Sequence, residues 1–214
     1  MKALFLDMDG LMVDTEKLYQ AAQNEIFGKY NILIDESILN KIMGQKPIDS
    51  CRILVEETGI PLQPEDLLHK RNQIMEQKLH SELKMMPGLM EFLLEFQGIY
   101  RMAVVTGASK KFLDSILASL NIRYFFSSFI SSDEIKKGKP EPEIYEKAME
   151  SLCVSKEHGI ALEDSSNGAL SAKRAGLYVI AIPNVYTSGQ NFSFVDYMAK
   201  DLYEAKEHIK NLIL

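Results

Sequence analysis

Residues 3–10 of the chain read ALFLDMDG, and this stretch decides the fold. Its first four residues are apolar, and a run of this length is typical of a strand buried inside a parallel sheet. Asp7 and Asp9 follow the run, separated by one residue, and Gly10 comes next. Because two carboxylates this close repel each other, their position at the end of a strand predicts a site that neutralises them.

The bulk composition indicates a globular protein with small partners. The chain has 214 residues, 46% of them hydrophobic and 25% charged, and a formal net charge of −6. This length suits one core with a smaller accessory domain, and the lack of a basic run argues against nucleic acid or an anionic membrane as partner. No segment has the roughly 20 apolar residues of a membrane span, and none resembles a secretion signal. We therefore expect a cytoplasmic monomer, with Cys51 and Cys153 as isolated, reduced thiols.

Three further apolar runs, at 102–106, 160–163 and 179–182, have the length of buried strands. Between them lie segments in which apolar residues recur every three or four positions, the pattern of a helix with one buried face. Strands that alternate with helices in this way are joined by right-handed crossovers. We therefore predict an α/β protein with a doubly wound, Rossmann-like parallel sheet.

The long interval between the first two apolar runs contains no strand-like pattern. Residues 16–86 show four successive helical patterns instead. We predict that they form a small all-helical cap domain, inserted into an α/β catalytic core that consists of 1–15 and 87–214. The two hinges between cap and core are expected near 13–15 and 85–88.

Polar residues stand at the ends of the predicted strands, where ligands bind in open α/β sheets. They are acids after the first and third runs, a hydroxyl and two small residues after the second, and a lysine in a Pro-rich loop: Asp7, Asp9, Glu163, Asp164, Thr106, Gly107, Ala108 and Lys139. Carboxylates gathered at one edge need a cation, and oxygen ligands without His or Cys nearby favour Mg²⁺. Lys139, Thr106 and the backbone N–H groups of the two residues after Thr106 predict an anion site beside the metal. A metal that faces an anion site indicates phosphoryl transfer.

These residues resemble the signature of the haloacid dehalogenase superfamily in their order, spacing and position after strands. DMDG at 7–10 is similar to the family's DxDx motif, and VVTG at 104–107 is similar to its hydroxyl motif. Lys139 in GKPEPEIY resembles the motif lysine, and LEDSSNG at 162–168 resembles the acidic motif. The resemblance covers nearly the whole chain, and it implies a Mg²⁺ cofactor and a small phosphorylated metabolite as substrate.

The resemblance also implies chemical roles for the first two acids. Asp7 would be the nucleophile that attacks phosphorus and forms an aspartyl-phosphate. Asp9 would be the acid that protonates the leaving oxygen and then the base that activates water. Lys139 and Thr106 would hold the phosphoryl oxygens while charge develops on them.

The implied metal site uses the same strand ends. Asp7, the backbone carbonyl of Asp9 and the carboxylate of Asp164 would bind Mg²⁺, while Glu163 lies in the same shell or just outside it. Gly10 would let the chain turn sharply after the second acid, at a place where a Cβ atom could obstruct the close approach of the backbone.

A phosphatase that acts on a sugar phosphate or a nucleoside monophosphate is the leading hypothesis. DMDGLMVDTEKLY at 7–19 and IMGQK at 42–46 resemble the subgroup that holds beta-phosphoglucomutase, deoxysugar phosphatases and pseudouridine monophosphate phosphatases. A phosphomutase is therefore the alternative enzyme. The mutase branch carries a His where this chain has Tyr19, and a tyrosine with its ordinary pKa of about 10 cannot do the same proton chemistry near neutral pH. The absence of this His favours hydrolysis.

A phospho-receiver signalling domain is a hypothesis from a different class of protein. Receivers also gather acids, a hydroxyl and a lysine around Mg²⁺ at a doubly wound sheet. They are shorter, however, and they carry no helical insertion, so the 16–86 segment argues against this reading. Turnover of a generic phosphate ester would indicate an enzyme, and a single stable phosphorylation would indicate a receiver.

Several polar residues near these motifs have simple structural explanations. Asp14 or Thr15 is expected to cap the first helix of the insertion. Ser165 is expected to cap the helix that follows the third apolar run. Lys46, Lys70 and Arg71 are expected to be solvated charges of the insertion, with contact between Lys46 and the substrate as the alternative.

Overall fold

Six parallel strands form the centre of the protein, in the order β3-β2-β1-β4-β5-β6. The computed structural model describes residues 2–42 and 45–212. The strands are β1 (Ala3–Leu6), β2 (Arg101–Val105), β3 (Ser128–Ile130), β4 (Gly159–Glu163), β5 (Tyr178–Ala181) and β6 (Tyr197–Met198). The strand order reverses between β1 and β4, and ligands bind outside the carboxyl ends of the strands at such a switch point. The prediction of a doubly wound parallel α/β sheet is confirmed.

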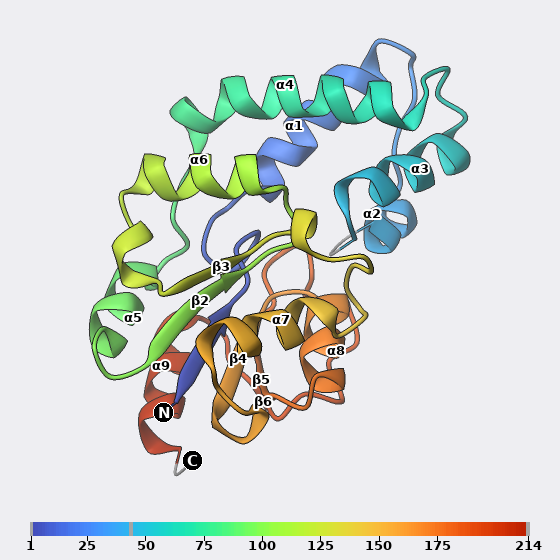
Figure 1. Ribbon diagram of the computed structural model, residues 1–214. Helices are drawn as coiled ribbons and strands as arrows, with labels where there is room; N and C mark the ends of the chain where they lie inside the picture. The colour runs from blue at the N-terminus through green and yellow to red at the C-terminus, as the bar shows by residue number, and fades with distance from the viewer. Residues whose placement is uncertain (1, 43–44, 213–214) are drawn as a thin grey trace.

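Helices cover both faces of the sheet (Figure 1). They are α5 (Leu89–Phe96), α6 (Lys110–Leu120), α7 (Glu143–Leu152), α8 (Ser166–Arg174) and α9 (Leu202–Asn211). Because side chains alternate along a strand, β1 contributes to two cores. Leu4 and Leu6 belong to the core that includes residues of α5, α6 and α9, whereas Ala3 and Phe5 belong to the core with α7 and α8.

The four apolar runs of the sequence form β1, β2, β4 and β5, with ends displaced by at most one residue. Two edge strands, β3 and β6, were not predicted. They have three and two residues, respectively, and their segments lack the continuous apolar run of a buried strand. Such short strands are specified by pairing with a neighbour more than by their own pattern.

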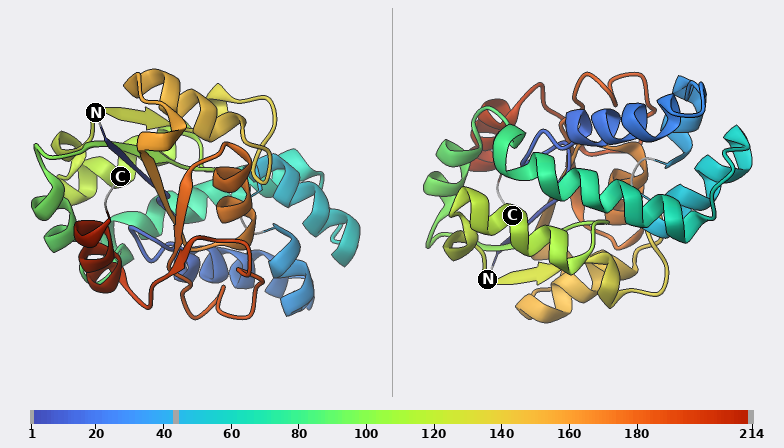
Figure 2. Two further views of the ribbon diagram at one scale, coloured as in Figure 1. Left: turned by 90° about the horizontal axis from the view of Figure 1, so that it is seen from below. Right: turned by 90° about the horizontal axis from the view of Figure 1, so that it is seen from above.

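In the described part of the 16–86 segment the structure has four helices, as the sequence predicts. They are α1 (Glu16–Gly28), α2 (Glu36–Ile42), α3 (Pro47–Thr58) and α4 (Pro64–Glu82). Figure 1 shows them beyond the carboxyl ends of the strands, and both views of Figure 2 show α1 and α4 running side by side. Met43 and Gly44, in the quoted motif at 42–46, lie outside the described residues. Among the helices of the described ranges, none is long and apolar enough to cross a membrane.

The two segments that join these four helices to the sheet run next to each other. Val13 and Met85 form an antiparallel bridge. The backbone N–H of Asp14 donates to the Lys84 carbonyl at 3.0 Å, and the N–H of Met86 donates to the Met12 carbonyl at 2.9 Å. We propose that α1–α4 act as a cap over a core made of 1–15 and 87–214, with this paired connection as its hinge.

Candidate active site

The carboxyl ends of β1 and β4 bring three acids together. The two strands are neighbours, with Leu6 opposite Leu162, and the backbone N–H of Asp7 donates to the Leu162 carbonyl at 3.1 Å. Asp7 and Asp164 follow the last paired residues, and Glu163 ends β4. One oxygen from each of these three carboxylates lies within 4.8 Å of the others, and all three side chains are buried.

Lys139 enters this cluster from the loop before α7 and bridges two of the acids. Its Nζ donates to Oδ1 of Asp7 at 2.5 Å and to Oε1 of Glu163 at 2.6 Å, and its side chain is only 2% exposed. The hydroxyl of Tyr145, on α7, donates to the same Glu163 oxygen at 2.5 Å. Glu163 therefore fixes the position of the ammonium group that faces Asp7.

For each group of this cluster, burial and the neighbouring charges have opposing effects on the pKa. Burial raises the pKa of Asp7 well above its usual range, and the Lys139 ammonium opposes this shift. Burial by itself would lower the pKa of Lys139, but the Asp7 and Glu163 carboxylates raise it above the usual lysine value. Lys139 therefore stays positively charged, and it provides a positive charge beside Asp7.

Asp9 sits in a different setting from Asp7, one residue away. Its Oδ1 accepts a hydrogen bond from the Thr15 hydroxyl at 2.8 Å, and its Oδ2 accepts one from the Thr106 hydroxyl at 2.9 Å. Burial raises the pKa of Asp9, while the two hydroxyl donors oppose the shift. The expectation that a side chain of Thr15 or Asp14 caps α1 is wrong, because Thr15 precedes the helix without a capping bond and uses its hydroxyl to hold Asp9.

Gly10 and Asn184 shape the backbone around Asp164. Gly10 has a φ of +80°, and a Cβ atom there would lie 2.2 Å from Oδ2 of Asp164, so the close approach requires glycine. The side-chain amide of Asn184, in the loop after β5, donates to Oδ2 of Asp164 at 2.8 Å and to the Gly10 carbonyl at 3.2 Å. Asn184 thereby ties the loop after β1 to the loop after β4.

Thr106, Gly107 and Ala108 follow β2 beside the same edge. The backbone N–H of Ala108 donates to the Thr106 hydroxyl oxygen at 3.0 Å, and Gly107 and Ala108 both line the cavity. Helix α6 begins two residues later, with Ser109 as its cap. The prediction that Ser165 caps the helix after β4 is confirmed, because its hydroxyl accepts from the Gly168 N–H at 3.2 Å.

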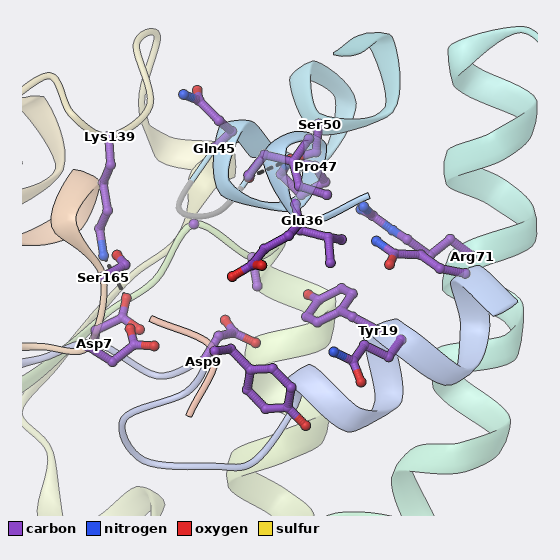
Figure 3. Close-up of a pocket in the computed structure, with 18 of the residues that line it drawn as sticks. Asp7, Asp9, Tyr19, Glu36, Gln45, Pro47, Ser50, Arg71, Lys139 and Ser165 are labelled. Atoms are coloured by element: carbon purple, nitrogen blue, oxygen red, sulfur yellow. Dashed lines mark hydrogen bonds and ion pairs between the residues drawn. The ribbon is translucent and has the colours of Figure 1, made fainter. Parts of the chain in front are cut away.

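A cavity of about 320 Å³ opens between these strand ends and the inserted helices. Figure 3 shows Asp7, Asp9 and Lys139 on one side of it and Gln45, Ser50 and Arg71 on the other. The wall formed by the strand ends is called the core wall below, and the wall formed by α1–α4 is called the cap wall.

Two charged residues of the insertion differ from the solvated surface charges that the sequence indicates. Arg71 is 5% exposed and lines the cavity. Lys46 is not among the lining residues. Its Nζ donates to the backbone carbonyls of Ile135 at 2.5 Å and Lys136 at 2.8 Å, so it joins the insertion to the loop that leads to Lys139.

Comparison with known families decides the kind of protein. Residues 4–182 match the family described as haloacid dehalogenase-like hydrolase. The chain belongs to this hydrolase family. The resemblance seen in the four sequence motifs is thereby confirmed, and so is the prediction of an enzyme, because the match is to hydrolases rather than to receiver domains.

Individual relatives are similar over most of their length. (DL)-glycerol-3-phosphatase 2 of Arabidopsis thaliana is 34% identical to this hydrolase over 193 residues, which cover 85% of this chain and 79% of that protein. A phosphorylated carbohydrates phosphatase of Thermotoga maritima is 32% identical over 179 residues, with 83% and 82% covered. Among solved structures, CbbY from Rhodobacter sphaeroides in complex with phosphate is 26% identical, with a TM-score of 0.85 over 95% of this chain and 96% of that one.

The sequence motifs of this hydrolase did not reveal four residues of the site: Thr15, Arg71, Tyr145 and Asn184. Asn184 follows the fourth apolar run closely, so the strand-end rule that found the acids could have found it too. Tyr145 lies on the buried face of α7 among core residues, and nothing in its spacing distinguishes it from a packed aromatic. Thr15 and Arg71 carry ordinary signals of a helix start and of a surface charge.

Proposed function

We propose that this hydrolase is a Mg²⁺-dependent phosphatase that releases phosphate from a small phosphorylated metabolite through an aspartyl-phosphate on Asp7. The observation that carries the proposal is the contrast between two acids at one cavity. Asp7 is bonded to the Lys139 ammonium within a cluster of carboxylates, whereas Asp9 is bonded to two hydroxyls. One acid is thus placed to meet a phosphate, and the other to exchange a proton.

The first half-reaction forms the covalent intermediate. A carboxylate oxygen of Asp7 attacks phosphorus, and the bond between phosphorus and the ester oxygen breaks. Protonated Asp9 gives its proton to the departing oxygen, and the raised pKa that burial causes favours this protonated form. The Lys139 ammonium and the Thr106 hydroxyl hold the phosphoryl oxygens as their charge increases.

The second half-reaction restores the enzyme. Asp9, now a carboxylate, takes a proton from water while the water oxygen attacks phosphorus. The bond between phosphorus and Asp7 then breaks, and inorganic phosphate leaves with Asp7 as a free carboxylate again. Thr15 keeps the Asp9 carboxylate in one orientation during both proton transfers, while the Thr106 hydroxyl turns from Asp9 to the phosphoryl group.

The residues present suit a divalent cation. Asp7, Glu163 and Asp164 bring three carboxylates against the one ammonium of Lys139, which leaves two negative charges in a buried cluster. The cluster offers oxygen donors alone, as Mg²⁺ prefers. Asp7 and Asp164, with the carbonyl of Asp9, would hold the ion, which would supply positive charge at the phosphoryl oxygens. Glu163 already accepts hydrogen bonds from Lys139 and Tyr145, so we place it beside the ion as support for Lys139.

The relatives support a carbohydrate-like substrate. Their names state action on glycerol 3-phosphate and on phosphorylated carbohydrates. The cavity of about 320 Å³ lies at the small end of the range of ligand pockets, about 300–1,000 Å³. A sugar phosphate or a compact phosphorylated polyol is therefore the substrate class that we propose.

Tyr19 supports hydrolysis over a mutase reaction. Its ring lies beneath the Arg71 guanidinium, with 5.5 Å between the guanidinium carbon and the ring centroid, and its centroid is 6.2 Å from that of Phe112. The residue is a packed aromatic at the cavity and provides no imidazole that could couple sugar binding to Asp9. Attack of water on the phospho-Asp7 intermediate therefore does not depend on sugar binding through an imidazole.

The test is release of inorganic phosphate from glycerol 3-phosphate, fructose 1-phosphate and para-nitrophenyl phosphate, with and without Mg²⁺. We expect turnover that requires Mg²⁺, and a labelled phospho-enzyme that can be trapped with acid in the native chain. A parallel incubation with beta-glucose 1-phosphate and a bisphosphate primer separates the two enzyme hypotheses. Glucose 6-phosphate that accumulates faster than free phosphate would overturn the assignment as a phosphatase.

A further inference from the structure

Arg71 is a buried cation with an unused hydrogen-bond donor at the cavity. It lies on α4, its side chain is 5% exposed, and its Nε–H has no hydrogen-bond partner. Among the side chains that the structure describes, none forms an ion pair or a hydrogen bond with its guanidinium. Its guanidinium carbon lies over the Tyr19 ring, 5.5 Å from the centroid, and its charge acts on the Asp9 carboxyl, whose pKa it lowers, without a hydrogen bond. Burial of a charge without a hydrogen-bonded partner is costly, so this arrangement indicates a ligand that supplies one.

Within the described chain, the acids that line the cavity do not form a hydrogen bond or an ion pair with Arg71. Both carboxylate oxygens of Asp9 accept hydrogen bonds from threonine hydroxyls. Oδ1 of Asp7 accepts from Lys139 on the core wall. Glu36 also lines the cavity, but it is exposed to solvent at the start of α2 and forms no ion pair with Arg71 in the described ranges. The guanidinium therefore faces the cavity with its donors available to a bound molecule (Figure 3).

We propose that Arg71 binds a second acidic group of the substrate, a carboxylate or a phosphate on the part that leaves with the hydroxyl. The proposal rests on the phosphatase function and narrows its substrate class. A guanidinium presents a planar fork of N–H donors that matches the two oxygens of a carboxylate or phosphate. A sugar hydroxyl would satisfy one donor and leave the charge without compensation, so an acid fits the site better than a neutral polyol.

The walls of the cavity separate the two binding tasks. The core wall holds the phosphoryl group that reacts, between Asp7 and Lys139. Gln20 and Gln23 of α1 and Leu39 of α2 also line the cavity, where they offer amide and apolar contacts to a short carbon chain. The Tyr19 ring lies beneath the guanidinium, and its electron-rich face attracts the positive charge.

Two pairs of substrates test this assignment, each pair differing mainly in one acidic group. 3-Phosphoglycerate carries a carboxylate where glycerol 3-phosphate carries a hydroxymethyl group, and fructose 1,6-bisphosphate carries a second phosphate that fructose 1-phosphate lacks. We expect the native chain to prefer the acidic member of at least one pair by about tenfold or more in kcat/KM. The pair in which the preference appears tells whether the second acid is a carboxylate or a phosphate.

Variants of Arg71 connect the preference to this side chain. In Arg71→Met the ratio of kcat/KM for the acidic member to that for the neutral member should fall by about tenfold or more. Arg71→Lys keeps the charge but loses the fork, so its ratio should lie between those of the native chain and Arg71→Met. Lys70→Met is the matched control, because Lys70 is the exposed neighbour on the same helix. Its ratio should equal that of the native chain.

Product inhibition provides a test that does not depend on a folded variant. Glycerate should inhibit the native chain more strongly than glycerol if the preference lies with the carboxylate. The assignment is overturned if the native chain prefers neither acidic member, or if Arg71→Met lowers kcat/KM for both members of a pair equally. Absence of activity toward para-nitrophenyl phosphate would instead contradict the phosphatase function itself, so the two failures can be told apart.

Discussion

The two walls of the cavity treat buried charge in different ways. On the core wall, Lys139 has two carboxylate partners at strand ends, and Asp9 has two hydroxyl partners, one directly after β2 and one directly before α1. On the cap wall, the buried guanidinium of Arg71 has an aromatic ring beneath it and an unused donor. The groups proposed for chemistry are thus satisfied within the protein, whereas the group proposed for recognition is not.

This difference has a physical reason. A reacting phosphoryl group needs charges that already point at it, because reorientation during the reaction would raise the barrier. Partners such as Tyr145 and Thr15 provide that fixed orientation. Selectivity between substrates instead arises when a binding group is left unsatisfied by the wrong molecule. The core wall therefore suits one reaction on many substrates, and the cap wall suits the choice among them.

The largest expected effect is on the core wall, at the proposed nucleophile. Asp7→Asn should lower kcat by about a thousandfold or more for every substrate, because an amide cannot form the aspartyl-phosphate. The change is nearly isosteric, so the fold should survive. Turnover and acid-trapped phospho-enzyme measure the effect, and circular dichroism checks the fold. Near-native turnover in this variant would remove Asp7 from the mechanism.

Loss of Lys139 should be the most damaging change to stability. Lys139→Met would leave the Asp7 and Glu163 carboxylates buried without their shared counter-charge, at a cost of about 3–5 kcal/mol in the free energy of unfolding. Urea denaturation without Mg²⁺ measures this cost directly. Lys137→Met is the matched control, because Lys137 is exposed two residues away. Equal midpoints for the two variants would contradict the buried ion-pair cluster.

Much of the core wall follows from the sequence, for reasons that concern strands. Buried parallel strands are continuous apolar runs, so the polar residues that end them mark the ligand edge directly. Asp7, Glu163 and Asp164 were located in this way, and Lys139 was located by its motif. Tyr145 escaped notice because a buried hydroxyl is visible only when its acceptor, Glu163, is known.

The cap wall was far less predictable. A lysine or arginine in an amphipathic helix is usually solvated, and the sequence does not say which one points toward a second domain. Arg71 and its exposed neighbour Lys70 differ by one position on α4, and only the packing of α4 against α1 and Tyr19 decides which of them is buried. Thr15 likewise has the position of a helix cap. Its hydroxyl donates to Asp9 instead and makes no capping bond.

The two walls should also respond differently to Mg²⁺. Asp164→Asn should raise the Mg²⁺ concentration for half-maximal activity by about tenfold or more, because it removes a charged oxygen ligand. It should also reduce the stabilisation by Mg²⁺, which we expect for the native chain to be about 2.7 kcal/mol at a concentration 100 times the Kd. Thermal unfolding at increasing Mg²⁺ provides the measurement. Glu36→Gln removes a carboxylate of the cap wall and should leave the Mg²⁺ response unchanged. A weaker response in this variant would indicate that the metal site lies at the cap wall.

The smallest expected effect concerns the joint between the walls. The Lys46 ammonium reaches the carbonyls of Ile135 and Lys136, and its Cγ would lie 2.9 Å from a Cβ atom on Gly138. The position of the insertion therefore affects the position of the loop that carries Lys139. Lys46→Met keeps most of the stem but loses both hydrogen bonds, which contribute about 1 kcal/mol at a partly exposed site. We expect KM to rise about fivefold, with a smaller change in kcat.

Lys41→Met separates this joint from a general loss of charge on the insertion. The Lys41 ammonium pairs with Glu57 at 2.6 Å inside the insertion and does not reach the strand ends. Such exposed pairs contribute little, so KM should stay near the native value in this control. If Lys46→Met and Lys41→Met have equal KM values, the contact to Ile135 and Lys136 does not govern how the walls meet. If Lys46→Met alone raises KM for every substrate, acidic or neutral, the joint acts on closure, whereas Arg71 acts on selection.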